Sequence, residues 1–359
     1  MTKSGRRGEK EGILNFSKEM ISALATALIF IIYVIQAFTI PTKSMEGSLL
    51  AGDFLLGLKF VYGAPVIPFT YLKFPGIRTP QRGDVVIFKY PGPERKDYIK
   101  RFVAVAGDTV WFDGADMYIN SVRTLPPDSA QFLQNGQFSF VEPYNRLIEE
   151  FDPLYIPGRG DTLDLVNAPL REFLFYKRLI HQENPRKRIR DYYTFKVNGD
   201  AQQEFGNQFV SDNMWPYDII SRFRFSSEWF DLIDQNPHFY WFNYVLVFEE
   251  IEKRFSYYYP DDTLTIGQTL TIDGTEIQEY VVQNDNYFAV GDNRDNSSDS
   301  RFWGFVNDNF VKAQAFIIYF SLEEDVPWFL LPAKIRWNRL GSLIRSWDGY
   351  EAALEDSTD

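Results

Sequence analysis

The longest apolar stretch of this chain lies near its N-terminus, where residues 21–42 (ISALATALIFIIYVIQAFTIPT) carry no charged side chain. About 20 helical residues, each rising about 1.5 Å, cross the ~30 Å of hydrocarbon in a bilayer. A cleaved signal peptide would have a shorter apolar region, followed by small residues at the cleavage site. Phe38 and Ile40 stand where those small residues would be needed. The pattern therefore predicts a retained transmembrane anchor at 19–41, after a tail at 1–18.

Basic residues are distributed unequally on the two sides of this anchor. Five precede it, whereas the nearest ones after it are Lys43 and Lys59. Positive charge favours the cytoplasmic side, so we expect a single-pass protein with a cytoplasmic N-terminus. The remaining chain then lies on the outer side, because no later apolar run is long enough to span. The run at 240–248 (YWFNYVLVF) has the length of a strand.

Turn signals divide the rest of the chain into short β-prone segments. A Gly-Asp turn followed by apolar residues occurs four times, at 51–56, 82–88, 106–112 and 159–165. Three further pairs are typical of hairpins: Asp113-Gly114, Asn198-Gly199 and Asp273-Gly274. An aromatic content of 17% also favours strands. The pattern predicts an antiparallel, mainly β body, in which 170–182 (LREFLFYKRLIHQ) is the best helical segment.

The C-terminal region shows a different periodicity. In residues 333–347 (AKIRWNRLGSLIRSW), four apolar residues fall at helical spacing with arginines between them: Leu340, Leu343, Ile344 and Trp347. This pattern predicts an amphipathic helix. Such a helix either lies on an anionic membrane surface or packs on the folded body, and the sequence leaves both interpretations open.

Composition excludes several classes of function. The net charge of −12 disfavours nucleic-acid binding, which needs a basic surface. With no cysteine in the chain, disulfides, thiolate nucleophiles and cysteine-ligated metals are excluded. The two histidines, His181 and His238, do not have metal-ligand spacing, and each is typical of an ordinary surface or core residue. We expect neither a metal nor a cofactor.

Catalysis by serine would therefore need a base other than histidine. Ser44 follows directly after the anchor, in the stretch FTIPTKSMEGSLLAGD (38–53). A lysine is a base only when neutral, and burial can lower its pKa from about 10.4 by up to about 3–5 units. Lys100 lies in an apolar stretch, DYIKRFVAVAGD (97–108), and shares a strand face with Tyr98 and Phe102. Spacing alone, however, still favours an exposed strand lysine.

A third polar cluster lies between two strand-like stretches, in FAVGDNRDNSSDSRFWGFV (288–306). A calcium loop is disfavoured there, because Arg294 occupies an expected ligand position and the sixth position is not glycine. Asn296-Ser297-Ser298 is formally a glycosylation sequon, which matters only in a eukaryotic secretory pathway.

Taken in order along the chain, these clusters resemble bacterial type I signal peptidases, the membrane-anchored serine-lysine proteases that remove signal peptides from exported preproteins. The resemblance is carried by PTKSM, RGDVVIFKYP, YIKRFVAVAGD and GDNRDNSSDSRFWGFV. It implies that Ser44 is the nucleophile and Lys100 its general base. It also implies an oxyanion hole made by the Thr42 hydroxyl and the Ser44 backbone N–H.

The same resemblance implies supporting residues. Ser297 would hydrogen-bond and orient the lysine, Asp299 and Arg301 would form a structural ion pair near the site, and Met45 would help to build apolar surroundings. The chain departs from the family pattern in one place. The family often has Met-x-Pro-Thr-Leu after the nucleophile, whereas this chain reads Met-Glu-Gly-Ser-Leu at 45–49. The missing proline puts the local substrate contacts in doubt.

The resulting expectation is a mainly β, antiparallel-sheet catalytic ectodomain with a large β-rich insertion, preceded by a single N-terminal transmembrane helix. The catalytic core would comprise 42–110 and 286–325, interrupted by the insertion at 111–285 and followed by an amphipathic segment and tail at 326–359. Its partners would be signal peptides and the lipid bilayer, at a bacterial inner membrane with the catalytic domain periplasmic; no oligomeric state is implied.

Two rival interpretations remain. An inactive, membrane-anchored β-rich binding protein would have the same fold. A self-cleaving serine-lysine repressor would be soluble and carry a DNA-binding module, which the anchor and the acidic charge disfavour.

Overall fold

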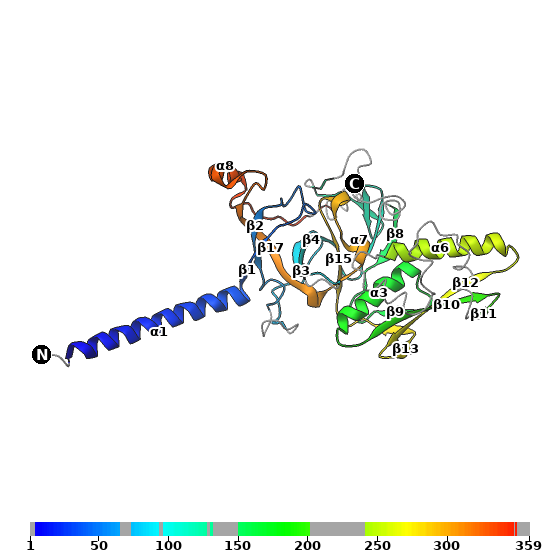
Figure 1. The fold of residues 1–359 in the computed structure, drawn as a ribbon, viewed down its shortest axis with the longest axis horizontal. Coiled ribbons are helices and arrows are strands. Elements are labelled where there is room, and N and C mark those ends of the chain that lie inside the picture. The colour runs from blue at the N-terminus through cyan, green and yellow to red at the C-terminus, as the bar shows by residue number, and fades with distance from the viewer. Residues whose placement is uncertain are drawn as a thin grey trace.

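One long helix and a body of mainly antiparallel strands make up the chain (Figure 1). The computed structural model describes residues 4–64, 73–92, 96–127, 130–131, 150–201, 241–347 and 349. The predicted fold class, a mainly β body after an N-terminal apolar helix, is confirmed.

The N-terminal helix α1 (Ser4–Tyr33) extends away from the body (Figure 1). Its segment Asn15–Tyr33 is long and apolar enough to cross a membrane. The helix nevertheless ends before the charge-free run does, so the prediction of helical structure up to residue 41 was wrong. Strand β1 (Ile35–Thr39) follows instead, because its backbone pairs along its full length with β2 (Asp53–Leu58).

The central sheet has seven strands in the order β1-β2-β17-β3-β4-β15-β16, with antiparallel pairing throughout. The strands not yet given are β17 (Val311–Ser321), β3 (Val85–Lys89), β4 (Asp97–Ala104), β15 (Asn286–Val290) and β16 (Val306–Asn307). Strands from both ends of the chain are therefore neighbours, and β17 lies between β2 and β3.

The region between β4 and β15 adds smaller sheets and two helices. One sheet has the order β7-β6-β5-β8, from β5 (Thr109–Asp113), β6 (Asp116–Ile119), β7 (Val122–Thr124) and β8 (Glu150–Tyr155). Another contains β10 (Ile189–Val197), β11 (Asp200–Ala201), β12 (Leu264–Ile272) and β13 (Thr275–Ile277), while β9 (Thr162–Asp164) pairs with β14 (Glu279–Val281). The helices are α3 (Leu170–Glu183) and α6 (Trp241–Tyr258).

The predicted turns are confirmed. Each of the four Gly-Asp turns directly precedes a strand, namely β2, β3, β5 and β9. The three hairpin pairs connect β5 to β6, β10 to β11 and β12 to β13. At Asn198-Gly199 and Asp273-Gly274 both residues have positive φ, as the tight turn requires. The helix predicted at 170–182 is α3.

Two predicted elements were wrong. A strand was predicted at 240–248, but the described residues 241–248 form the first part of α6. Their buried side chains Trp241, Tyr244 and Phe248 continue at helical spacing to Ile251 and Phe255.

The amphipathic helix predicted at 333–347 is likewise not formed. Short helical turns, α8 (Leu331–Lys334) and a 3₁₀ turn at Trp337–Arg339, are followed by extended chain. The amides of Gly341 and Ile344 donate to backbone oxygens of β17, and pairing with this strand replaces the helix. Trp347 packs against the main core, so this segment lies on the folded body.

Candidate active site

Ser44 lies in a tight turn between β1 and β2. The amide of Glu46 donates to the Lys43 carbonyl at 2.9 Å, and the amide of Leu49 donates to the Met45 carbonyl at 2.8 Å. The side chains of Met45 and Leu49 are completely buried in an apolar cluster formed with β2, β3 and β17. The turn is therefore anchored by apolar side chains directly after Ser44, in the apolar surroundings that the resemblance implies for Met45.

Lys100 approaches Ser44 from β4. Its Nζ lies 2.6 Å from Ser44 Oγ and also donates to the Ile99 carbonyl at 3.0 Å. Only 4% of Lys100 is exposed, and Nζ lies 5.5 Å from the centre of the Tyr98 ring. As an ammonium, Lys100 donates to the Ser44 hydroxyl; as a neutral amine, it accepts the hydroxyl proton across the same contact.

Burial lowers the pKa of Lys100 to about 8, against the smaller opposite effect of the Asp299 and Asp292 carboxylates. Removing an ammonium from water disfavours its charged form, which explains the direction. At neutral pH about a tenth of the molecules therefore hold this amine neutral. The pair has the geometry and the protonation equilibrium of a nucleophile with its general base.

A cavity of about 530 Å³ opens beside this pair. Its walls come from 38–44, from 96–100 and from Ile87, Asn296 and Ser298. Thr42 Oγ1 lies 3.4 Å from Ser44 Oγ, with either hydroxyl able to donate. The cavity combines apolar side chains such as Ile40 and Ile87 with polar groups, which suits an organic substrate held in one orientation.

The loop after β15 packs against the turn that contains Ser44. A Cβ on Gly291 would lie 2.2 Å from Ser297 Oγ and 2.4 Å from the Ser44 carbonyl oxygen, so only glycine fits here. Ser297 is 1% exposed, and its Oγ has no hydrogen-bond partner among the described residues. The hydrogen bond from Ser297 to Lys100 that the resemblance implies is therefore not formed. Asp299 and Arg301 do form a buried ion pair, with Nε and Oδ1 2.9 Å apart.

The residues that hold this loop to the turn were not predicted from the sequence. The Asn293 amide donates to the Ser44 carbonyl at 3.2 Å, and its side chain donates to the Lys43 carbonyl at 3.1 Å. Arg101 donates to both oxygens of Asp292 at 2.8 and 2.7 Å. The density of polar residues at 291–301 was the available signal, but it did not identify these contacts.

Asp292 also accepts a hydrogen bond from the hydroxyl of Ser48. Ser48 is one of the residues that depart from the family pattern, and this contact ties that part of the turn to the loop after β15. Gly47 has a φ of 105°, a conformation that favours glycine. The turn is thus held by hydrogen bonds and glycine where the family often has proline.

His181, the one histidine among the described residues, offers no competing base at this site. His181 is exposed on α3 and does not line the cavity beside Ser44. His238 lies outside the described residues.

Comparison with known proteins identifies the family to which this chain belongs. The family model described as signal peptidase, peptidase S26, matches residues 13–146 and 249–320, together more than half of the chain. The chain belongs to this signal peptidase family. The matched residues include both Ser44 and Lys100, as well as the loop after β15.

Relatives within the signal peptidase family match most of the chain. A signal peptidase I of Helicobacter pylori is 27% identical over 360 residues, covering 95% of this chain and 95% of its own. One of Aquifex aeolicus is 27% identical and covers 80% of this chain and 77% of its own. A solved signal peptidase I of Enterococcus faecalis aligns with 67% of this chain and 98% of its own, at 15% identity and a TM-score of 0.22. That score is too low to add an argument about the fold.

Proposed function

We propose that this chain is a membrane-bound serine endopeptidase that removes signal peptides from exported preproteins. The observation that carries the proposal is the 2.6 Å contact between Ser44 Oγ and the buried Nζ of Lys100. Family membership and the relatives named signal peptidase I support it. An inactive binding protein would have no need of a buried lysine at this position.

The reaction begins when neutral Lys100 takes the Ser44 hydroxyl proton and the oxygen attacks the substrate carbonyl. The Thr42 hydroxyl and the Ser44 backbone N–H stabilise the resulting oxyanion. Lys100 then gives its proton to the leaving amine, and the peptide bond breaks to leave an ester on Ser44. Water attacks this ester with Lys100 again as base, which frees the signal peptide carboxylate and restores the serine.

The substrate binds as an extended segment in the cavity lined by 38–44 and 96–100. Extended peptides commonly add to strand edges, with alternate side chains entering pockets. We infer that small residues fit at the first and third positions before the cleaved bond, as the family resemblance implies. The Asp299–Arg301 ion pair and the close packing of Gly291 against Ser297 stabilise the loop behind Ser44 and Lys100.

The membrane places enzyme and substrate together. We propose that α1 spans the bacterial inner membrane with its N-terminus in the cytoplasm, and that the body lies on the periplasmic side. The short helix α8 lies on the same side of the molecule as α1 (Figure 1). In and before α8, four consecutive apolar residues are exposed: Trp328, Phe329, Leu330 and Leu331. Such side chains are suited to the interface of a bilayer.

The test is cleavage of a preprotein with alanines at both specificity positions, in lipid vesicles, by the wild-type chain and Ser44→Ala. We expect Ser44→Ala to lose about 1000-fold or more of the wild-type rate, as nucleophile removal does in other serine proteases. Ser121→Ala, at an exposed hairpin turn outside the cavity, is the matched control and should cleave normally. Absence of cleavage by the wild type would favour the inactive binding protein, and near-normal turnover by Ser44→Ala would refute the dyad.

A further inference from the structure

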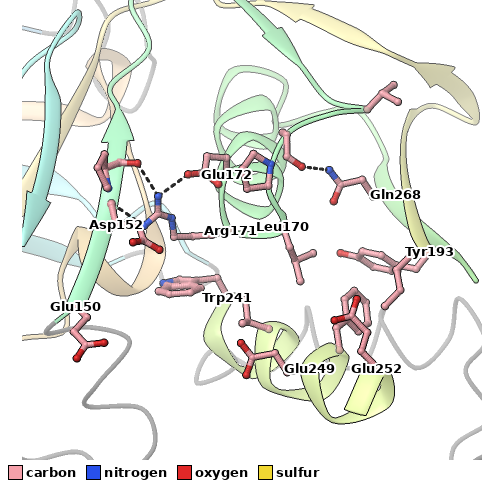
Figure 2. Close-up of a pocket in the computed structure, with 17 residues that line it drawn as sticks. Glu150, Asp152, Leu170, Arg171, Glu172, Tyr193, Trp241, Glu249, Glu252 and Gln268 are labelled. Carbon is pink, nitrogen blue, oxygen red and sulfur yellow. Dashed lines mark hydrogen bonds and ion pairs between the residues drawn. The ribbon is translucent and has the colours of Figure 1, made fainter. Parts of the chain in front are cut away.

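A second cavity, of about 720 Å³, lies between α3, α6 and strands β8, β10 and β12 (Figure 2). It shares no lining residue with the cavity beside Ser44. The proposed reaction therefore gives this cavity no role.

Aromatic and aliphatic side chains form one part of its wall. Trp241 and Phe248 come from α6, and Tyr193 comes from β10. The rings of Tyr193 and Phe248 meet edge to face, with centroids 5.0 Å apart. Leu170 and Ile266 add aliphatic surface. This wall is suited to an apolar ligand group, and its ring faces are suited to a cation.

Four of the carboxylates that line the cavity come from β8 and α6. Glu150 and Asp152 lie on β8, while Glu249 and Glu252 lie one turn apart on α6 (Figure 2). None of the four forms an ion pair in the part of the chain that the structure describes. Burial and the Glu249 charge raise the pKa of Glu252, so these two carboxylates repel each other without a cation between them.

The one basic residue among the described lining residues, Arg171, is already engaged. It donates to the backbone oxygens of Asp152 and Pro153 and pairs with Glu172. Arg171 is 8% exposed, yet within the described part of the chain its Nε has no hydrogen-bond partner, and neither has the buried Oε2 of Glu172. Behind the wall there are thus an unsatisfied donor and an unsatisfied acceptor, both buried from solvent, which is costly in a folded protein.

We propose that this cavity binds a cationic, amphipathic peptide segment. A lysine or arginine side chain would lie between the carboxylates of Glu249 and Glu252, and a neighbouring apolar side chain would pack on Trp241 and Phe248. The partner is thus a polypeptide with basic and apolar residues side by side. This binding is independent of cleavage at Ser44.

Fluorescence anisotropy of a labelled, capped peptide of alternating leucine and lysine tests the proposal on the full chain in detergent. We expect binding by the wild type, and binding at least about tenfold weaker by the double variant Glu249→Gln, Glu252→Gln, because both charge contacts to the lysine side chain are lost. A peptide with glutamate in place of lysine should not bind. Both substituted residues are exposed, so the variant should fold and cleave a model substrate at the wild-type rate.

The matched control is Glu276→Gln, Glu279→Gln, which changes the net charge equally at exposed positions of β13 and β14. It should bind within about twofold of the wild type. Equal weakening by both double variants would reduce the effect to net charge and overturn the proposal, as would unchanged binding by the α6 variant. Equally tight binding of hexylamine at the same residues would assign the cavity to simple organic cations and overturn the peptide partner.

Discussion

Lys100 is a cationic residue placed where a cation is unfavourable. Its side chain is almost completely buried, and burial lowers its pKa to about 8. The neutral amine that results is what a general base requires, so the same environment that favours catalysis also opposes folding. The negative charges of Asp299 and Asp292 favour the ammonium form of Lys100, but they offset only part of this cost.

This cost predicts that Lys100→Met is inactive but more stable than the wild type at pH 7. A pKa of about 8 in the folded chain and about 10.5 in the unfolded chain corresponds to a penalty of about 3 kcal/mol, since each pKa unit is worth about 1.4 kcal/mol. The folded state binds fewer protons, so the penalty is complete below about pH 8 and disappears as the pH rises through about 10.5. Denaturant unfolding at pH 7 and pH 10 measures it.

The stability gain of the methionine variant should accordingly shrink at the higher pH. A variant that is less stable than the wild type at pH 7, by the same free energy at pH 10, would show that burial does not lower the pKa of Lys100.

Thr42 offers a second prediction at the residue scale. Thr42→Val removes the hydroxyl that lies 3.4 Å from Ser44 Oγ and keeps the shape of the side chain. We expect kcat to fall about 100- to 1000-fold with little change in KM, because an oxyanion donor acts mainly in the transition state. Thr42→Ser, which keeps the hydroxyl, is the matched control and should retain most activity. Equal rates for the two variants would remove Thr42 from the oxyanion hole.

At the scale of elements, Lys59 stabilises the junction between α1 and the central sheet. Lys59, directly after β2, donates from Nζ to the carbonyls of Ile31 and Ile32, both at 3.2 Å. Its backbone amide donates to the carbonyl of Val34 at 2.9 Å. A cation at the C-terminal end of a helix satisfies free carbonyls and interacts favourably with the helix dipole. Lys59 thereby links the direction of the proposed anchor to the sheet that carries the dyad.

We therefore predict that Lys59→Met lowers the cleavage of a membrane-embedded preprotein about three- to tenfold, since about 1 kcal/mol of junction hydrogen bonding is lost. Cleavage of a short soluble peptide in detergent should stay within about twofold, because the dyad is untouched. Lys187→Met, at an exposed position, is the matched control. Equal loss on both substrates would indicate general destabilisation instead of altered positioning.

The elements also show how far local pattern predicts structure. The Gly-Asp and Asn-Gly turns were predicted correctly, because the positive φ that such a turn needs depends on the identity of one or two residues. The failures came from longer-range pairing. Residues 240–248 have strand length, but their helical period becomes visible only with Phe255 included. Residues 341–344 have helical spacing, but they pair with β17, a partner that no local pattern specifies.

For the site, sequence placed Ser44 and Lys100 correctly near each other only through the resemblance, since spacing alone favoured an exposed lysine. Asn293 was missed because its role depends on a backbone contact with Ser44 from a residue far along the chain. The unpartnered hydroxyl of Ser297 could not be anticipated, because hydrogen-bond geometry is set by tertiary packing.

At the scale of the whole molecule, the sheet order explains why distant residues meet. Strands β1 and β2 flank the Ser44 turn, β4 carries Lys100, and β15 leads into the loop that supports both. The anchor helix and α8 lie at one side of the molecule, whereas α6 lies at the other (Figure 1). Residues of α6 line the second cavity. Catalysis next to a membrane and peptide binding away from it would thus use separate surfaces.

The most direct test of a neutral Lys100 base is the pH dependence of kcat/KM for cleavage of a soluble alanine-x-alanine peptide by the wild-type chain. Because only the neutral amine accepts the Ser44 proton, kcat/KM should rise about tenfold per pH unit below about pH 8 and level off above it. A profile that stays flat from about pH 6 to about pH 9 would contradict an amine base with the pKa of this buried lysine.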